Sequence, residues 1–172
     1  MRELVFGEEF AVVQPTALLA DCIDGAIGVL GAALVDKGVR VVDRPLCTLG
    51  KNTELRPTLV VEDSISAKPN LVVEFRTEST SRYILGPKRL AYGRMGIPEL
   101  WYVDPGYRRV LVMVLDGTSQ RFEWPATVFQ SDELLRPVGV SLTPLTVGEL
   151  LSHWPRSHVL DSDMGASWPS DV

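Results

Sequence analysis

The chain is poor in the residues that build covalent or metal-bridged folds, with only two cysteines and two histidines in 172 residues. Cys22 and Cys47 lack metal-site spacing, so we expect buried free thiols in a reducing compartment. His153 and His158 have no acidic or thiol partner in register, so we expect both on the surface. The composition therefore argues against a disulfide scaffold and against a zinc protein.

Long apolar runs are also missing. No stretch approaches the roughly 18–20 uninterrupted apolar residues of a membrane helix, and the opening string MRELVFGEEF has acids where a signal peptide is apolar. We therefore expect a soluble, cytoplasmic protein with no membrane partner. With 45% hydrophobic residues the length suits one domain, placed at residues 1–154, followed by a polar tail over 155–172 that we expect to be loose.

The apolar residues that are present recur with the periods of a mixed α/β fold. ELVFGEEFAVVQ predicts a hairpin around Gly7, and the next segment predicts a helix from an N-cap at Thr16 to about Asp36, stopped by Gly38. Glycines at 25, 28 and 31 would let another element approach that helix closely. Three further strands are predicted in VRVVDRPLCTL, ELRPTLVVED and LVVEF, a hairpin in RVLVMVLDG-TSQRFEWPA, and a short helix over 146–151. The expected architecture is a mixed β-sheet flanked by helices.

The segment from 68 to 105, KPNLVVEFRTESTSRYILGPKRLAYGRMGIPELWYVDP, carries the functional argument. Alternation in LVVEF puts Glu74 on one strand face with Val72 and Arg76. An acid within an apolar strand requires an ion-pair partner, a metal or an exposed strand end, and Arg76 and Lys88 are the candidate partners. Lys88 and Tyr92 share one face of the following helix at spacing i, i+4.

With these strings in view, the chain resembles the Uma-two family of restriction endonucleases, a branch of the PD-(D/E)xK nuclease superfamily. The resemblance runs from Glu3 to about Leu151, and its most specific part runs from Lys88, with Tyr92 four residues on, through GIPELWYVDP. It implies a restriction-endonuclease-like core and metal-dependent hydrolysis of DNA, with carboxylates holding Mg²⁺ and a lysine assisting the attacking water. It also implies that Glu74 is the metal-binding acid and Lys88 the catalytic lysine.

Among the departures from the family pattern, two lie at positions where the family has an aspartate. The first catalytic aspartate usually follows a Gln-Pro pair, and here the equivalent string is Arg56-Pro57-Thr58, so Thr58 replaces it. Asn70 likewise stands where the family has an aspartate before its second acid. Because a neutral hydroxyl holds a hard dication far more weakly than a carboxylate, the resemblance implies that hydrolysis is weakened or lost.

A replacement acid has to come from elsewhere in the chain. Glu54 and Glu62 share a strand face with Thr58, but four residues along a strand span about 13 Å, too far to ligate the same ion. Glu3, in the N-terminal string, and Asp43, on a neighbouring strand, remain as acids that the fold could bring to Glu74.

Charge bears on the expected partner. The chain carries −5 overall, yet residues 74–109 hold seven basic and four acidic residues, which leaves a local +3. Arg76, Arg82 and Arg89 are the candidate DNA contacts, although these charges are more typical of a solvated helix surface than of a single-strand stacking platform. Three functions stay open: a Mg²⁺-dependent endonuclease, a silent DNA-binding nuclease fold, and a protein-interaction module. Homodimerisation is expected only by analogy with nucleases that cut two strands.

Overall fold

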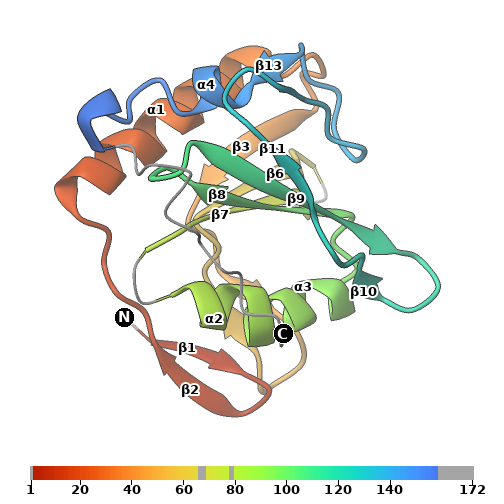
Figure 1. Ribbon diagram of the computed structural model, residues 1–172. Helices are drawn as coiled ribbons and strands as arrows, with labels where there is room; N and C mark the ends of the chain where they lie inside the picture. The colour runs from red at the N-terminus through yellow and green to blue at the C-terminus, as the bar shows by residue number, and fades with distance from the viewer. Residues whose placement is uncertain (1, 66–68, 78–79, 159–172) are drawn as a thin grey trace.

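A seven-stranded mixed sheet forms the centre of the computed structural model, which describes residues 2–65, 69–77 and 80–158 (Figure 1). The strand order is β10-β9-β8-β7-β6-β3, and β11 also pairs with β9. β7 and β8 run parallel, and the other paired strands of this sheet are antiparallel. The strands are β3 (Val39–Asp43), β6 (Leu59–Asp63), β7 (Pro69–Phe75), β8 (Glu99–Asp104), β9 (Arg109–Asp116), β10 (Arg121–Phe122) and β11 (Thr127–Phe129).

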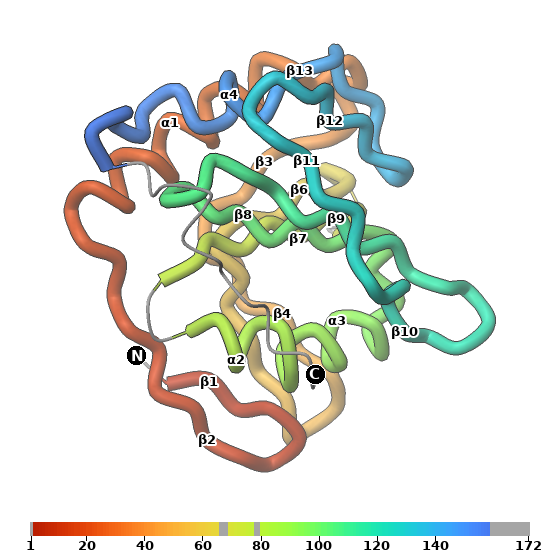
Figure 2. Tube along the Cα trace, viewed as in Figure 1, coloured from red at the N-terminus to blue at the C-terminus, as the bar shows by residue number. Residues whose placement is uncertain are grey.

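Helices cover both faces of this sheet, as the sequence predicts (Figures 1 and 2). One face packs against α1 (Ala17–Ala33) and α4 (Val147–Leu150), beside the hairpin of β12 (Leu134–Leu135) and β13 (Leu145–Thr146). The other face packs against α2 (Ser81–Tyr83), the π-helical turn η1 (Ile84–Lys88) and α3 (Arg89–Arg94). Each face has its own buried apolar core, so β7 is covered on both sides.

Strand alternation in β7 is confirmed. Leu71, Val73 and Phe75 belong to the core beneath α1, whereas Val72 belongs to the core beneath α2 and α3. Successive side chains of a strand point to opposite faces, so Glu74 shares the face of Val72. The sequence pattern therefore delivers Glu74 to the face covered by the helix that carries Lys88.

A second sheet corrects the prediction of three successive strands between residues 39 and 75. It is antiparallel, has the order β2-β1-β5-β4, and consists of β1 (Arg2–Val5), β2 (Glu8–Ala11), β4 (Cys47–Thr48) and β5 (Glu54–Leu55). ELRPTLVVED is split between the two sheets, because the chain leaves β5 at Arg56 and enters β6 at Leu59. Pro57 in this crossing has no N–H for a ladder hydrogen bond.

The long helix begins as predicted and ends earlier. The Thr16 hydroxyl caps α1 by accepting a hydrogen bond from the Leu19 N–H at 3.3 Å. The helix stops at Ala33 rather than near Asp36, because Leu34 turns into extended backbone and forms a β-bridge with Leu142. A tertiary strand contact thus overrides the helical pattern that the sequence continues.

The predicted close approach at the α1 glycines holds at Gly25 only. A Cβ there would lie 2.4 Å from Cγ of His153, whereas at Gly28 and Gly31 it would meet no atom within 4 Å. His153 and His158 are exposed, as expected.

The two cysteines match their prediction in part. Both are free thiols, but Cys22 is buried and Cys47 only partly so, and burial raises the pKa of each to about 11. Within the described ranges, no helix has the length and apolarity needed to cross a membrane. Residues 156–158 form a short 3-10 turn, η2 (Arg156–His158), and the rest of the predicted tail, 159–172, lies outside the described residues.

Candidate functional site

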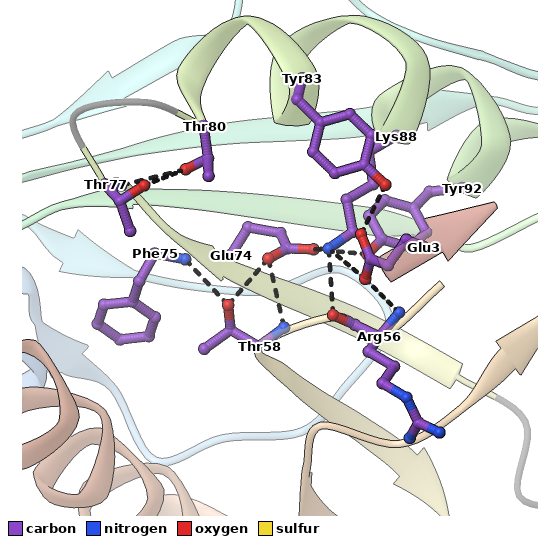
Figure 3. A network of polar contacts seen from close by, with 10 residues as sticks. All are labelled: Glu3, Arg56, Thr58, Glu74, Phe75, Thr77, Thr80, Tyr83, Lys88 and Tyr92. Carbon is purple, nitrogen blue, oxygen red and sulfur yellow. Dashed lines mark hydrogen bonds and ion pairs between the residues drawn. The ribbon is translucent and has the colours of Figure 1, made fainter. Parts of the chain in front are cut away.

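Glu74 lies near the C-terminal end of β7, where its carboxylate is buried beneath α2, η1 and α3 (Figure 3). Its Oε1 atom accepts hydrogen bonds from the Tyr92 hydroxyl at 2.5 Å and from Lys88 Nζ at 2.7 Å. Its Oε2 atom accepts from the Thr58 hydroxyl at 2.9 Å. The spacing i, i+4 between Lys88 and Tyr92 therefore directs both side chains to one carboxylate.

Lys88 is 3% exposed, and its ammonium group meets three acceptors (Figure 3). Nζ lies 2.7 Å from Glu74 Oε1, 3.1 Å from Glu3 Oε1 and 3.1 Å from the Arg56 carbonyl oxygen. An ammonium has three N–H donors, so its hydrogen-bonding capacity is fully used. Pro87 and the non-helical backbone of Gly86 place this lysine in the wide turn η1, facing the sheet.

Glu3 is the second acid that the sequence left undecided between Glu3 and Asp43. Its side chain is 1% exposed, and it binds Lys88 through Oε1 and the Tyr83 hydroxyl through Oε2 at 2.6 Å. Asp43 instead pairs with Arg44, and both of those side chains are exposed. Strand pairing of β1 with β5 brings the N-terminus to this position, which residue spacing along the chain does not reveal.

Thr58 holds the position where the family pattern has an aspartate. Its hydroxyl donates to Glu74 Oε2 and accepts from the Phe75 N–H at 3.4 Å, and its own N–H lies 3.3 Å from the same carboxylate oxygen. The threonine therefore acts as a neutral donor to Glu74. We call Glu3, Thr58, Glu74, Tyr83, Lys88 and Tyr92 the Lys88 cluster.

The electrostatics of the Lys88 cluster keep the lysine charged. Burial on its own lowers the pKa of Lys88, but Glu74 and Glu3 outweigh burial, and the pKa is raised. Burial together with the negative charge of Glu74 raises the pKa of Tyr92 well above its ordinary value, and burial with the Glu3 hydrogen bond raises that of Tyr83. The cluster thus consists of one ammonium between two carboxylates, held by neutral hydroxyl groups.

These residues do not fit the Mg²⁺ site that the resemblance implies. Mg²⁺ is bound through carboxylates and keeps several waters, whereas each oxygen of Glu74 already accepts a hydrogen bond from the Lys88 cluster. Over residues 2–65, 69–77 and 80–158, no group of three or more His, Cys, Asp or Glu side chains is placed to hold a metal ion. A dication at Glu74 would have to displace the Lys88 ammonium, and Thr58 would offer it only a neutral oxygen.

A small pocket of about 70 Å³ reaches the Lys88 cluster. Its walls are mainly apolar, with Leu19 and Ile23 from α1 and the β2–α1 connection contributing to them. Two arginines that sequence reasoning missed, Arg44 and Arg56, also line it. The Arg56 guanidinium points away from the cluster (Figure 3), although its backbone binds both Glu3 and Lys88.

The other predicted site residues lie apart. Arg76 pairs with Asp104 at 2.8 Å rather than with Glu74, because β7 has already ended and the parallel neighbour β8 places its own terminal acid there. Arg82 is exposed on α2, and the Arg89 guanidinium lies over the Trp124 ring, 4.8 Å from its centroid. Asn70 is at the start of β7, well removed from Glu74. Glu74, Lys88 and Thr58 are thus brought together, and the three predicted DNA-contacting arginines are not.

The raised pKa values predict a loss of stability in alkaline solution. Burial raises the pKa of Tyr83, Tyr92 and Tyr102, in the case of Tyr102 to about 12. These phenols therefore stay neutral in the folded chain at a pH where they ionise in the unfolded chain, near pH 10. Lys88 acts in the same direction, because its folded pKa is also raised. The contribution of these groups to the free energy of unfolding is therefore fully present below about pH 10. It falls above that pH by up to about 1.4 kcal/mol per pH unit for each group.

A spectrophotometric titration of the phenolate, with circular dichroism recorded in parallel, tests this expectation. Three of the four tyrosines should stay un-ionised until the protein unfolds. Ionisation of all four with an unchanged dichroism spectrum would contradict the buried placement.

Comparisons with known proteins bear on the family and on the fold. A family model, Uma2, described as "Putative restriction endonuclease", matches residues 41–148. A structure described as a "putative nuclease belonging to DUF820" from Anabaena variabilis superposes with a TM-score of 0.74 at 18% identity, covering 90% of this chain and 91% of that one. The type IIG restriction endonuclease BpuSI gives a TM-score of 0.48 at 16% identity, covering 87% of this chain and 18% of the larger enzyme. No curated protein matches the chain significantly.

The family match covers more than half of the chain, including Thr58, Glu74 and Lys88. The likeness to the Anabaena variabilis structure extends over nearly all of both chains and supports the same fold. The protein therefore belongs to the Uma2 family and has a restriction-endonuclease-like α/β fold.

Proposed function

We propose that this protein is a DNA-binding member of its family in which metal-dependent hydrolysis is lost or nearly lost. The observation that carries the proposal is the position of the Lys88 ammonium between Glu74 and Glu3, with Thr58 in place of the first acid. In this arrangement the charge that would bind a dication is already neutralised by a lysine.

The proposed loss of hydrolysis follows from the same contacts. A metal-activated water requires a dication held by carboxylates, and the two carboxylates present share one ammonium. A lysine that assists catalysis requires a free N–H for the phosphate or water, and all three N–H groups of Lys88 have protein acceptors. Both catalytic requirements compete with interactions that stabilise the buried cluster.

DNA remains the proposed partner because the family and the charge distribution favour it. Arg44, Arg56 and Lys88 line the pocket, with Glu74 as the single carboxylate among its described lining residues. Arg56 has no ion-pair partner among residues 2–65, 69–77 and 80–158. A guanidinium of this kind suits a phosphate, which it can bind through two N–H groups.

Calorimetric titration of Mg²⁺ and Mn²⁺ into the protein tests the proposed loss of metal-dependent hydrolysis at its first requirement, metal binding. We expect no binding at millimolar metal, and no difference between the native protein and Glu3→Gln or Glu74→Ala. Millimolar or tighter binding that disappears in both variants would overturn the proposal, because it would mean that Glu3 replaces the missing aspartate as a ligand.

Fluorescence anisotropy with a labelled DNA duplex tests the proposed binding. Affinity should fall with rising salt and with Arg44→Gln and Arg56→Gln, and should not depend on metal. Absence of duplex binding, or binding indifferent to both arginines, would favour a protein-interaction role for this fold.

A further inference from the structure

A second concave surface is lined by residues of the helical segment and of the chain around β10. The elements α3 and β10 lie side by side (Figure 1). This surface is a groove of about 390 Å³ that Arg89 and Leu90 line from the helix, and Arg121, Phe122 and Trp124 line from the β10 strand and the turn after it. Sites for small ligands commonly have roughly 300–1,000 Å³, so the groove has room for a nucleotide.

The groove exposes apolar and aromatic surface. Trp124 is 41% exposed and Leu90 45% exposed, while Phe122 is 7% exposed and closes the floor. The Arg89 guanidinium lies over the Trp124 ring at 4.8 Å from the centroid. An exposed tryptophan held by an arginine is the type of platform on which an unpaired nucleobase stacks.

The groove also has uncompensated positive charge. No carboxylate is among its lining residues, and neither Arg89 nor Arg121 makes an ion pair within the described parts of the chain. One terminal nitrogen of Arg89, Nη1, is buried without a hydrogen-bond acceptor among these residues. A buried N–H without an acceptor is costly, so the protein leaves the charge of this guanidinium uncompensated.

We propose that this groove binds single-stranded nucleic acid, with a base stacked on Trp124 and the adjoining phosphate paired with Arg121 and Arg89. Charge complementarity selects an anionic ligand, and the exposed indole selects one that carries planar aromatic groups, which single-stranded DNA combines in every nucleotide. The inference rests on the proposed DNA-binding function and adds the form of the nucleic acid and a place for it.

The test measures anisotropy of a labelled oligo-dT strand on the full chain. Trp124→Ala should weaken binding about tenfold or more, whereas Trp124→Phe should retain most of it because a phenyl ring still stacks. Arg121→Gln should weaken binding and reduce its salt dependence. Arg136→Gln removes an exposed arginine outside the groove, on the segment between β12 and β13, and should change nothing.

Each alternative outcome is distinct. Equal oligo-dT affinity in the native protein and Trp124→Ala overturns the inference. Duplex binding that depends on Arg44 and Arg56, with no oligo-dT binding, overturns the inference and leaves the proposed function standing. Displacement of oligo-dT by polyglutamate at equal charge concentration shows a site for acidic peptides and also overturns it. Thermal melts of every variant confirm that the fold is retained.

Discussion

Replacement of Lys88 by methionine is expected to lower the free energy of unfolding at neutral pH by about 3–5 kcal/mol, the usual cost of removing one partner of a buried ion pair. Without the ammonium, Glu74 and Glu3 would remain buried as neighbouring carboxylates, each less than 4% exposed at its side chain. Methionine keeps the length and apolar volume of lysine, so the loss of stability measures the contribution of the charge and of its hydrogen bonds.

Urea unfolding at neutral pH measures this effect. Lys51→Met is the matched control, because Lys51 is exposed in a turn and should contribute little. The double variant Lys88→Met, Glu74→Gln should recover much of the lost stability. A Lys88→Met protein as stable as the Lys51→Met control would mean that the ammonium does not lie between the two acids.

Thr58→Asp is expected to make the stability of the protein depend on divalent metal. The new carboxylate would lie against Glu74 Oε2, where the Thr58 hydroxyl is now 2.9 Å away. Two carboxylates at such a separation repel each other unless a proton or cation lies between them. The variant should therefore be less stable than the native protein without metal and should regain stability when Mg²⁺ or Mn²⁺ binds.

Thermal melts with and without metal provide the measurement. Metal at one hundred times its dissociation constant stabilises the folded state by about 2.7 kcal/mol. For a chain of this size that stabilisation raises Tm by about 5–10 °C. Thr58→Asn is the matched control, because it has the same shape without the charge and should not respond to metal. Identical melting of Thr58→Asp in metal and in chelator would show that the missing aspartate alone does not account for the lost site.

Local patterns predicted most of the fold. Alternation in LVVEF assigned Glu74 to the correct sheet face, and the i, i+4 spacing aimed Lys88 and Tyr92 at the same target. Thr16 caps α1 as its residue type suggests. Predictions failed where a distant segment intervened, as at Leu34, which leaves the helix because Leu142 pairs with it.

The candidate site was predicted in part. Glu74 and Lys88 are adjacent, as the resemblance implies, but the partner of Arg76 is Asp104, at the end of the neighbouring parallel strand. The charges of 74–109 indicated a solvated helix surface rather than a stacking platform, yet Trp124 reaches Arg89 through the pairing of β10 with β9 and the packing of α3. Sequence spacing cannot show contacts made between segments that only the fold brings together.

The sequence by itself determined the family, the alternation of buried and exposed faces, and the replacement of an acid by Thr58, because each depends on residue type and local period. Only the tertiary structure decided that Glu3 would share the Lys88 ammonium with Glu74, and that Arg89 would stack on Trp124. Both contacts join elements far apart in the chain, and a buried charge takes whichever partner the packed sheets and helices place within a few ångströms of it.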